Sequence, residues 1–196
     1  MTETPLSVER ILEASEDVLR RYGPAKATVA DVTRELGVSH GSVYRHFPSK
    51  AALRDAVVDR WLGEISAPLA DVAGEEVPAL ERLRRWLDLL VETKQSRARE
   101  DPELFATYTE LAANARVVIG AHVKTLTDQL TRIIADGVAW GEFDIANPEA
   151  TARAVFDATS RFHNPANAAA WADPGINQAY EAVRSLVLAG LSEMPG

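Results

Sequence analysis

Cysteine is absent from the 196 residues, which excludes a disulfide framework, a thiolate metal site and a cysteine nucleophile. No uninterrupted apolar run approaches the ~18 residues that a membrane-spanning helix requires. The opening segment, MTETPLSVERIL, carries no apolar signal core. These absences favour a soluble, cytoplasmic protein that has no membrane partner.

Common catalytic signatures are also missing: the sequence has no Walker A motif, dinucleotide glycine fingerprint or H-E-x-x-H pair. One string, Gly37-Val38-Ser39-His40-Gly41, spells G-x-S-x-G, but a nucleophile elbow needs a strand before the serine and this string follows a helical run. His122 and His163 have no carboxylate or histidine three or four residues further on, which argues against a metal site. We therefore expect no enzyme, no cofactor and no metal.

Apolar residues recur at helical spacing along almost the whole chain, and no segment shows convincing strand alternation. Glycine and proline interrupt the pattern, as at Gly23-Pro24, Gly37, Phe47-Pro48 and Asn147-Pro148. The pattern predicts an all-α fold of about nine helices. A looser stretch rich in alanine, asparagine and proline, residues 163–175, precedes the last helix.

The net charge of −8 is unevenly distributed along the chain. Residues 1–60 hold nine Lys/Arg and nine Asp/Glu, whereas residues 61–196 hold twelve and twenty. Affinity for phosphate depends on local positive groups and helix N-termini more than on whole-chain charge. A nucleic-acid partner at the neutral N-terminal end is therefore compatible with the acidic total.

Two short helices meet across Gly37-Val38-Ser39, where glycine suits the left-handed backbone that ends a helix. By spacing, the second helix buries only Val43 and Phe47. Its other side chains are hydrogen-bonding or cationic and are expected to face outward: His40, Ser42, Tyr44, Arg45 and His46. Such a face suits base edges and phosphates in DNA. On this chemistry alone, a solvated polar helix face explains it equally well.

The run TVADVTRELGVSHGSVYRHFPSKAAL resembles the signature of the tetracycline-repressor (TetR) family. The positions that match in register are Gly37, Val38, Ser39, Gly41, Tyr44, His46, Phe47, Ser49, Lys50 and Leu53. The resemblance covers about residues 7 to 60 and implies a dimeric transcriptional regulator with one helix-turn-helix per subunit, which we expect to be a ligand-responsive repressor. It also implies a near-palindromic double-stranded DNA operator.

Several contacts and domains follow from this resemblance. Phosphate contacts are implied for Thr28, Ser39, Tyr44, His46 and Lys50, and base contacts for Ser39, His40, Gly41, Ser42 and Arg45. The DNA-binding domain is expected over residues 5–65, with the reader at 28–47 and a connector helix at about 50–70. A helical effector-binding and dimerisation domain is expected over residues 71–196.

In the C-terminal part, the resemblance implies a pocket for a small hydrophobic effector of unknown identity, lined by Trp86, Phe105, Tyr108, Phe156 and His163. For each of these residues, ordinary core packing is the alternative. The homodimer surface is expected to involve Phe162, Tyr180, Val183, Val187 and Leu191. The alternatives left open are an activator in place of a repressor, an enzyme, and a binding module without a DNA role.

Overall fold

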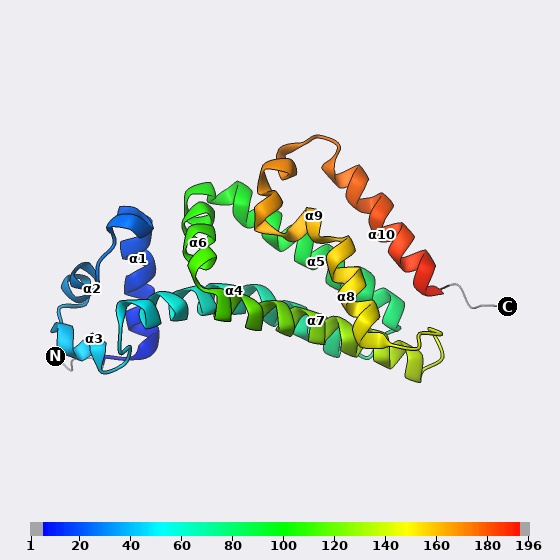
Figure 1. The fold of residues 1–196 in the computed structure, drawn as a ribbon, viewed down its shortest axis with the longest axis horizontal. Coiled ribbons are helices and arrows are strands. Elements are labelled where there is room, and N and C mark those ends of the chain that lie inside the picture. Colours follow the sequence, from blue (N-terminus) through cyan, green and yellow to red (C-terminus); the bar gives the residue numbers. More distant parts are fainter. Residues whose placement is uncertain (1–5, 193–196) are drawn as a thin grey trace. The chain divides into compact units, whose positions relative to one another are not determined.

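The structure, a computed structural model, describes residues 6–192, and every regular element in that range is helical (Figure 1). The elements are α1 (Val8–Lys26), α2 (Val29–Leu36), α3 (His40–Tyr44), α4 (Lys50–Gly74), α5 (Ala79–Glu100), α6 (Pro102–Asn114), α7 (Arg116–Ala139), α8 (Pro148–Ala158), α9 (Ser160–His163), the 3-10 helix η1 (Pro165–Ala172) and α10 (Ile176–Ser192). The all-α prediction is confirmed. Among residues 6–192, no helix is both long and apolar enough to cross a membrane.

The prediction of a loose stretch over residues 163–175 was wrong, because this segment contains the end of α9 and the helix η1. Asn164 caps η1 by accepting a hydrogen bond from the backbone N–H of Ala166 at 3.0 Å. Pro165 stands at the first helical position, where its missing N–H has no helical partner to lose. The alanines that follow favour helix, so the composition that suggested a loop supports a short helix instead.

The chain divides into two compact units, which we describe separately. Unit 1 comprises the chain up to Leu62 together with residues 101–120. Unit 2 comprises residues 63–100 and the chain from Ala121 onward. Residues 101–120, which contain α6, therefore cluster with the N-terminal helices, although the sequence led us to expect them in the C-terminal domain.

Unit 1 is built on α1, whose residues Ile11 and Val18 are buried. In Figure 1, α2 and α3 lie next to one another beside α1. The Arg54 guanidinium donates to the backbone oxygen of Pro24 at 2.8 Å and so ties α4 to the end of α1. Trp61 of α4 stacks on Tyr108 of α6, with ring centroids 4.6 Å apart. These contacts hold the helices of unit 1 together, although α2 and α3 are too short to be stable alone.

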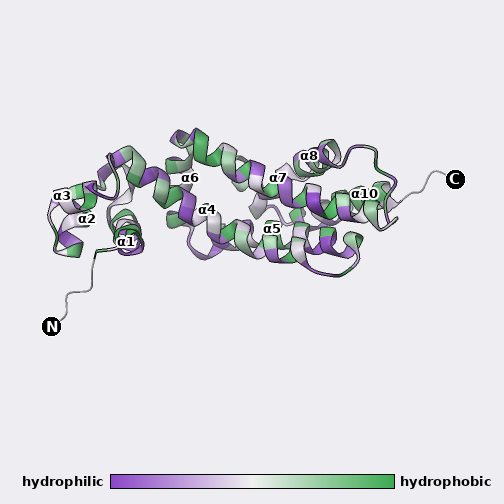
Figure 2. Ribbon diagram, turned by 90° about the horizontal axis from the view of Figure 1, so that it is seen from below, coloured by the Kyte–Doolittle hydropathy of each residue, from purple (hydrophilic) through white to green (hydrophobic). Residues whose placement is uncertain are grey.

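Unit 2 is organised around α5. Its residues Leu83, Trp86, Leu87 and Leu90 are fully buried. Figure 2 shows hydrophobic and hydrophilic positions interleaved along the helices, the pattern of amphipathic elements that share a core. Helix α10 docks on α5, and Tyr180 donates from its hydroxyl to Oδ1 of Asp88 at 2.9 Å.

Candidate functional site

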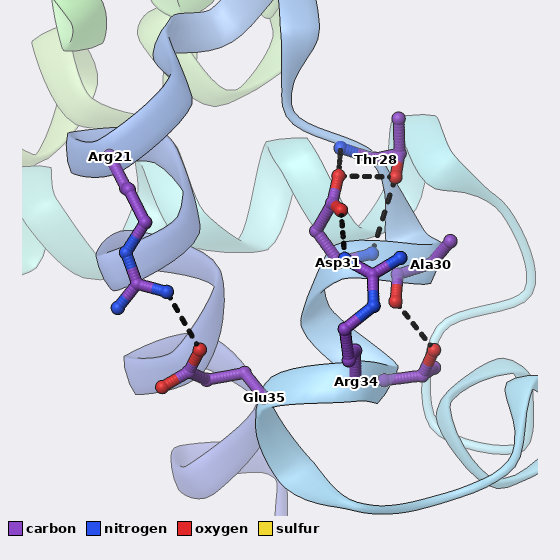
Figure 3. A network of polar contacts seen from close by, with 7 residues as sticks. Arg21, Thr28, Ala30, Asp31, Arg34 and Glu35 are labelled. Carbon is purple, nitrogen blue, oxygen red and sulfur yellow. Dashed lines mark hydrogen bonds and ion pairs between the residues drawn. The ribbon is translucent and has the colours of Figure 1, made fainter.

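The start of α2 is fixed by a reciprocal pair of hydrogen bonds between Thr28 and Asp31 (Figure 3). The Thr28 hydroxyl accepts from the Asp31 N–H at 3.2 Å, and the Asp31 carboxylate accepts from the Thr28 N–H at 3.1 Å. The same carboxylate accepts the Thr28 hydroxyl proton at 2.6 Å, which lowers the pKa of Asp31. Thr28 is exposed, but its hydroxyl already forms hydrogen bonds within the protein.

The turn between α2 and α3 has the geometry that the sequence indicates. Gly37 adopts φ +67° and ψ 29°, the left-handed region in which glycine avoids the steric penalty of a side chain. The Val38 N–H donates to the Thr33 oxygen at 3.0 Å and closes the helix end. Ser39 then caps α3 by accepting from the Ser42 N–H at 3.2 Å. The G-x-S-x-G string therefore lies between two helices.

Helix α3 presents a polar face to solvent. Val43 is 1% exposed and Phe47 is 8% exposed, so these two residues anchor the segment on the core of unit 1. The residues around them are exposed: His40, Gly41, Tyr44, Arg45 and His46. The His40 and Tyr44 rings lie 6.4 Å apart between centroids. The outward face that the spacing predicts is present.

The remaining residues of this face are also accessible. Ser39 is exposed and Ser42 is partly exposed, and their hydroxyl oxygens are 3.0 Å apart. Arg45 reaches the Ser42 hydroxyl only at 3.4 Å, a weak contact that leaves most of its donors available. Lys50 is exposed at the first position of α4, where Ser49 caps the helix by accepting from the Ala52 N–H at 3.0 Å.

The five residues expected to line the effector pocket divide between the two units. Phe105 and Tyr108 belong to unit 1, where both rings pack against Trp61. Trp86, Phe156 and His163 belong to unit 2, and the Phe156 and His163 rings lie 4.7 Å apart. All five are buried within the chain, as the core-packing alternative also requires.

Three of the five expected dimer residues lie in the interior of a single chain. Phe162 is 2% exposed and Tyr180 is 8% exposed, and they pack edge-to-face within a cluster that also contains Val91 and Ile176. They have almost no surface left for a partner, because α9 and α10 both fold back onto α5. Leu191 is also buried. Val183 and Val187 remain partly exposed, and the neighbouring Leu186 is 74% exposed.

The sequence-based reasoning missed a buried polar cluster in unit 2. Lys94 of α5, His122 of α7 and His163 of α9 are all buried, and the charge of Lys94 contributes to lowering the pKa of both histidines. A signal for two of them was present in the sequence. Lys94 continues the buried stripe of Leu87 and Leu90, and His122 precedes Leu126 by one helical turn. Within residues 6–192, no three His, Asp or Glu side chains gather as a metal site would require.

Comparison with protein-family models gives two matches that together cover most of the described helices. Residues 11–57 match the model described as bacterial regulatory proteins, tetR family. Residues 79–184 match the model described as the tetracyclin repressor-like C-terminal domain. The second match spans more than half of the chain and extends the likeness beyond the segment that carried it in the sequence.

Individual proteins are also similar to this chain. The nucleoid occlusion factor SlmA of Vibrio vulnificus is 33% identical over 84 residues, which are 42% of this chain and 43% of that protein. The chain thus spans less than half the length of such curated relatives. Among solved structures, SmeT, the repressor of the Stenotrophomonas maltophilia multidrug efflux pump SmeDEF, is 19% identical with a TM-score of 0.70 over 98% of this chain and 93% of its own.

A second solved structure carries a ligand. The transcriptional regulator FadR from Bacillus subtilis, in complex with stearoyl-CoA, has a TM-score of 0.65 and 18% identity. The match covers 94% of this chain and 100% of that one. At these identities, both solved structures establish the fold.

Proposed function

The chain belongs to the tetracycline-repressor family of bacterial transcriptional regulators, and from this premise we propose that it is a ligand-responsive repressor. In this proposal, a homodimer binds a near-palindromic operator and a small hydrophobic effector releases it. The observation that carries the proposal is the outward polar face of α3, anchored from behind by Val43 and Phe47. Only these two side chains are buried against the core of unit 1, so the rest of the surface of α3 is available to contact DNA.

On this face, Arg45 is assigned to base reading. Its guanidinium is exposed and weakly engaged, and it can donate two parallel hydrogen bonds to O6 and N7 of a guanine. Ser42 and His40 supply single hydrogen bonds to neighbouring base edges. These residues lie within two turns of one helix, the span over which a recognition helix follows the major groove.

Phosphate contacts are assigned to the residues that flank this helix: Ser39, Tyr44, His46 and Lys50. The exposed Lys50 ammonium begins α4, where the unpaired N–H groups of the first turn also favour an anion. Thr28 belongs to this set only if a phosphate displaces the bond from its hydroxyl to Asp31. We expect Thr28 to contribute mainly by fixing α2.

Gly41 supports the same assignment. A Cβ built at this position would meet only the Ser39 oxygen, at 3.8 Å, which is an ordinary contact. The fold itself therefore leaves room for a side chain on this exposed position of α3. A close approach of the helix to the wall of a DNA groove explains the glycine.

The effector and the dimer surface are assigned to unit 2. The buried residues Trp86, Phe156 and His163 supply a largely apolar environment for a small molecule. The solved relative that holds stearoyl-CoA supports a small-molecule effector for this fold. For the dimer, we propose the exposed side of α10 around Leu186, with Val183 and Val187 at its margin.

DNA footprinting tests the proposal. The chain is incubated at moderate salt with the DNA upstream of its own gene and treated with hydroxyl radicals. Two protected stretches on one face of the duplex, about one helical turn (~10 base pairs) or a multiple apart, are expected from a dimer with two recognition helices. Absence of protection at any defined site would overturn the repressor function. A single protected half-site would overturn the dimeric arrangement.

A further inference from the structure

An arginine from the last turn of α2 lies beside the first turn of the same helix. The Arg34 side chain is 72% exposed, and its Nη1 donates to Oδ1 of Asp31 at 2.8 Å. Helical side chains lean toward the N-terminus of their helix, so a residue meets the one three positions before it. In Figure 3 the Arg34 guanidinium lies next to Asp31. The end of its side chain is therefore close to the start of α2.

A single carboxylate links this guanidinium to Thr28. While Oδ1 of Asp31 accepts from Arg34, Oδ2 accepts from the Thr28 hydroxyl at 2.6 Å and from the Thr28 N–H at 3.1 Å. The Thr28 hydroxyl has one proton, and this bond uses it. A guanidinium has five N–H donors, and the contact with Asp31 uses only one nitrogen. At the start of α2, Arg34 therefore has donors to spare and the Thr28 hydroxyl has none.

The ion pair between Arg34 and Asp31 affects surface charge more than stability. Exposed ion pairs contribute little to the free energy of unfolding, and the bonds between Thr28 and Asp31 already cap the helix. Hydrogen bonds from Thr28 and Arg34 lower the pKa of Asp31, so this carboxyl is ionised at neutral pH. Without Arg34, the start of α2 would carry an uncompensated negative charge.

This charge matters because the start of α2 flanks the proposed reader. Helix α2 packs against both α1 and α3. Its other acidic residue, Glu35, is directed to α1, where it pairs with Arg21 at 3.1 Å (Figure 3). Asp31 is thus the carboxylate nearest to a phosphate that approaches Thr28, and like charges repel. A phosphate at this place requires a cation that compensates Asp31, and Arg34 is in contact with it.

We propose that Arg34 is a further DNA-contacting residue, and that its guanidinium binds the backbone phosphate at the start of α2. One nitrogen stays on Asp31, and the others donate to the phosphate oxygens, an arrangement that suits the planar guanidinium. Arg34 thereby takes the contact that the Thr28 hydroxyl could make only by leaving Asp31. Such a contact positions the reader without reading sequence. The inference rests on the proposed function, because it adds a backbone contact to the reader.

Ethylation interference on the footprinted operator tests this contact. Ethylating a phosphate removes its charge, so the modified positions that prevent binding are those that the protein contacts. We expect the wild-type chain to be sensitive at one phosphate in each half-site at which the Arg34→Met chain is no longer sensitive. The remaining sensitive phosphates should be the same for both chains.

Titrations of operator and scrambled DNA at several salt concentrations measure the same contact as an affinity. Arg34→Met should weaken binding to both duplexes about tenfold, as expected when a hydrogen bond to a charged group is lost, and should reduce the salt dependence. Arg34→Lys keeps the charge and should retain the salt dependence of the wild-type chain, which a merely structural role would not predict. Urea unfolding should give the same midpoint for all three chains, because the side chain is exposed.

Arg153→Met is the matched control. Arg153 is an exposed arginine on α8 in unit 2, and its Nε donates to Asp157 at 3.2 Å. The substitution also removes an arginine from an exposed pair with an aspartate, but away from the reader. It should leave the affinity, the salt dependence and the ethylation pattern unchanged.

The inference is overturned if Arg34→Met binds as tightly as the wild-type chain, or if it keeps the complete ethylation pattern. An equal loss in Arg153→Met would also overturn it, because the effect would then reflect the total charge. Wild-type binding is measured first. Its absence would overturn the reader itself and this contact with it, whereas normal wild-type binding with an unaffected Arg34→Met chain would overturn the contact alone.

Discussion

The exposed face of α3 and the Lys94 cluster of unit 2 use similar side chains in opposite environments. Both contain histidine and a cationic residue, yet Arg45, His40 and His46 lie in solvent, whereas Lys94, His122 and His163 are buried. An exposed cation can bind a large, strongly charged partner with only a small desolvation free energy. Burial, more than residue type, therefore separates the proposed DNA reader from the buried residues of unit 2.

The largest expected effect is the pH dependence of the free energy of unfolding, which tests the buried histidine of α7. Burial lowers the pKa of His122 from 6.5 to about 3, so the unfolded chain takes up a proton there before the folded chain does. Stability is then fully present above about pH 6.5 and is lost as the pH falls toward 3, by about 1.4 kcal/mol per pH unit for this residue. Urea unfolding at a series of pH values measures this slope.

In this experiment, His122→Leu removes the titrating group and should flatten the slope by that amount between about pH 6 and 4. His40→Gln, at the exposed start of α3, is the matched control for the loss of a histidine. Identical slopes in wild type and His122→Leu would contradict the buried, neutral state of this ring.

The next effect concerns base reading. Arg45→Ala removes the proposed bidentate donor and should cost about 1–3 kcal/mol of binding to the operator. It should also relax discrimination at particular base pairs, because the contact distinguishes guanine from the other bases. Fluorescence anisotropy with single-base operator variants measures both quantities. Equal losses on operator and scrambled DNA would assign Arg45 to the phosphate backbone instead.

A smaller effect is expected for a residue that contacts phosphate alone. Lys50→Ala should weaken binding to all sequences alike and reduce the slope of log affinity against log salt by about one. The slope is obtained from binding curves at several salt concentrations. Lys124→Ala, which removes an exposed lysine of unit 2, should leave the slope unchanged. A salt slope unaffected by Lys50→Ala would exclude this phosphate contact.

The smallest expected change in stability comes from adding a single Cβ atom to α3. This substitution is expected to affect folding and DNA binding in opposite directions. Gly41→Ala should raise the free energy of unfolding by about 0.5–1 kcal/mol, since alanine favours helix and the site has room for Cβ. The same substitution should weaken DNA binding. Gly37→Ala, at φ +67°, should instead destabilise the fold. Undiminished operator affinity in Gly41→Ala would remove the argument for close groove approach.

Much of unit 1 was predictable from sequence because its signals are local. The caps at Ser39 and Ser49 act over three residues, and the glycine turn at Gly37 is set by its own backbone. The all-α class follows in the same way from apolar spacing. Each of these interactions involves residues that are close together in the sequence, so a short sequence pattern is enough to predict it.

The buried sites of unit 2 depend on distant segments, and here sequence reasoning failed in specific ways. Phe162 and Tyr180 are 18 residues apart and both pack on α5, which spacing along a single helix does not reveal. His122 and His163 each seemed isolated in the sequence. The effect of the Lys94 charge on the pKa of both rings arises only in the folded chain, because the three residues lie on the separate helices α5, α7 and α9.

The central claim is that the exposed face of α3 reads a defined DNA sequence. Its most direct test is the equilibrium affinity of the wild-type chain for its footprinted upstream duplex and for a scrambled duplex of equal length and composition, at one moderate salt concentration. The account predicts that the first is bound at least about a thousandfold more tightly. Equal affinity for the two duplexes would contradict it.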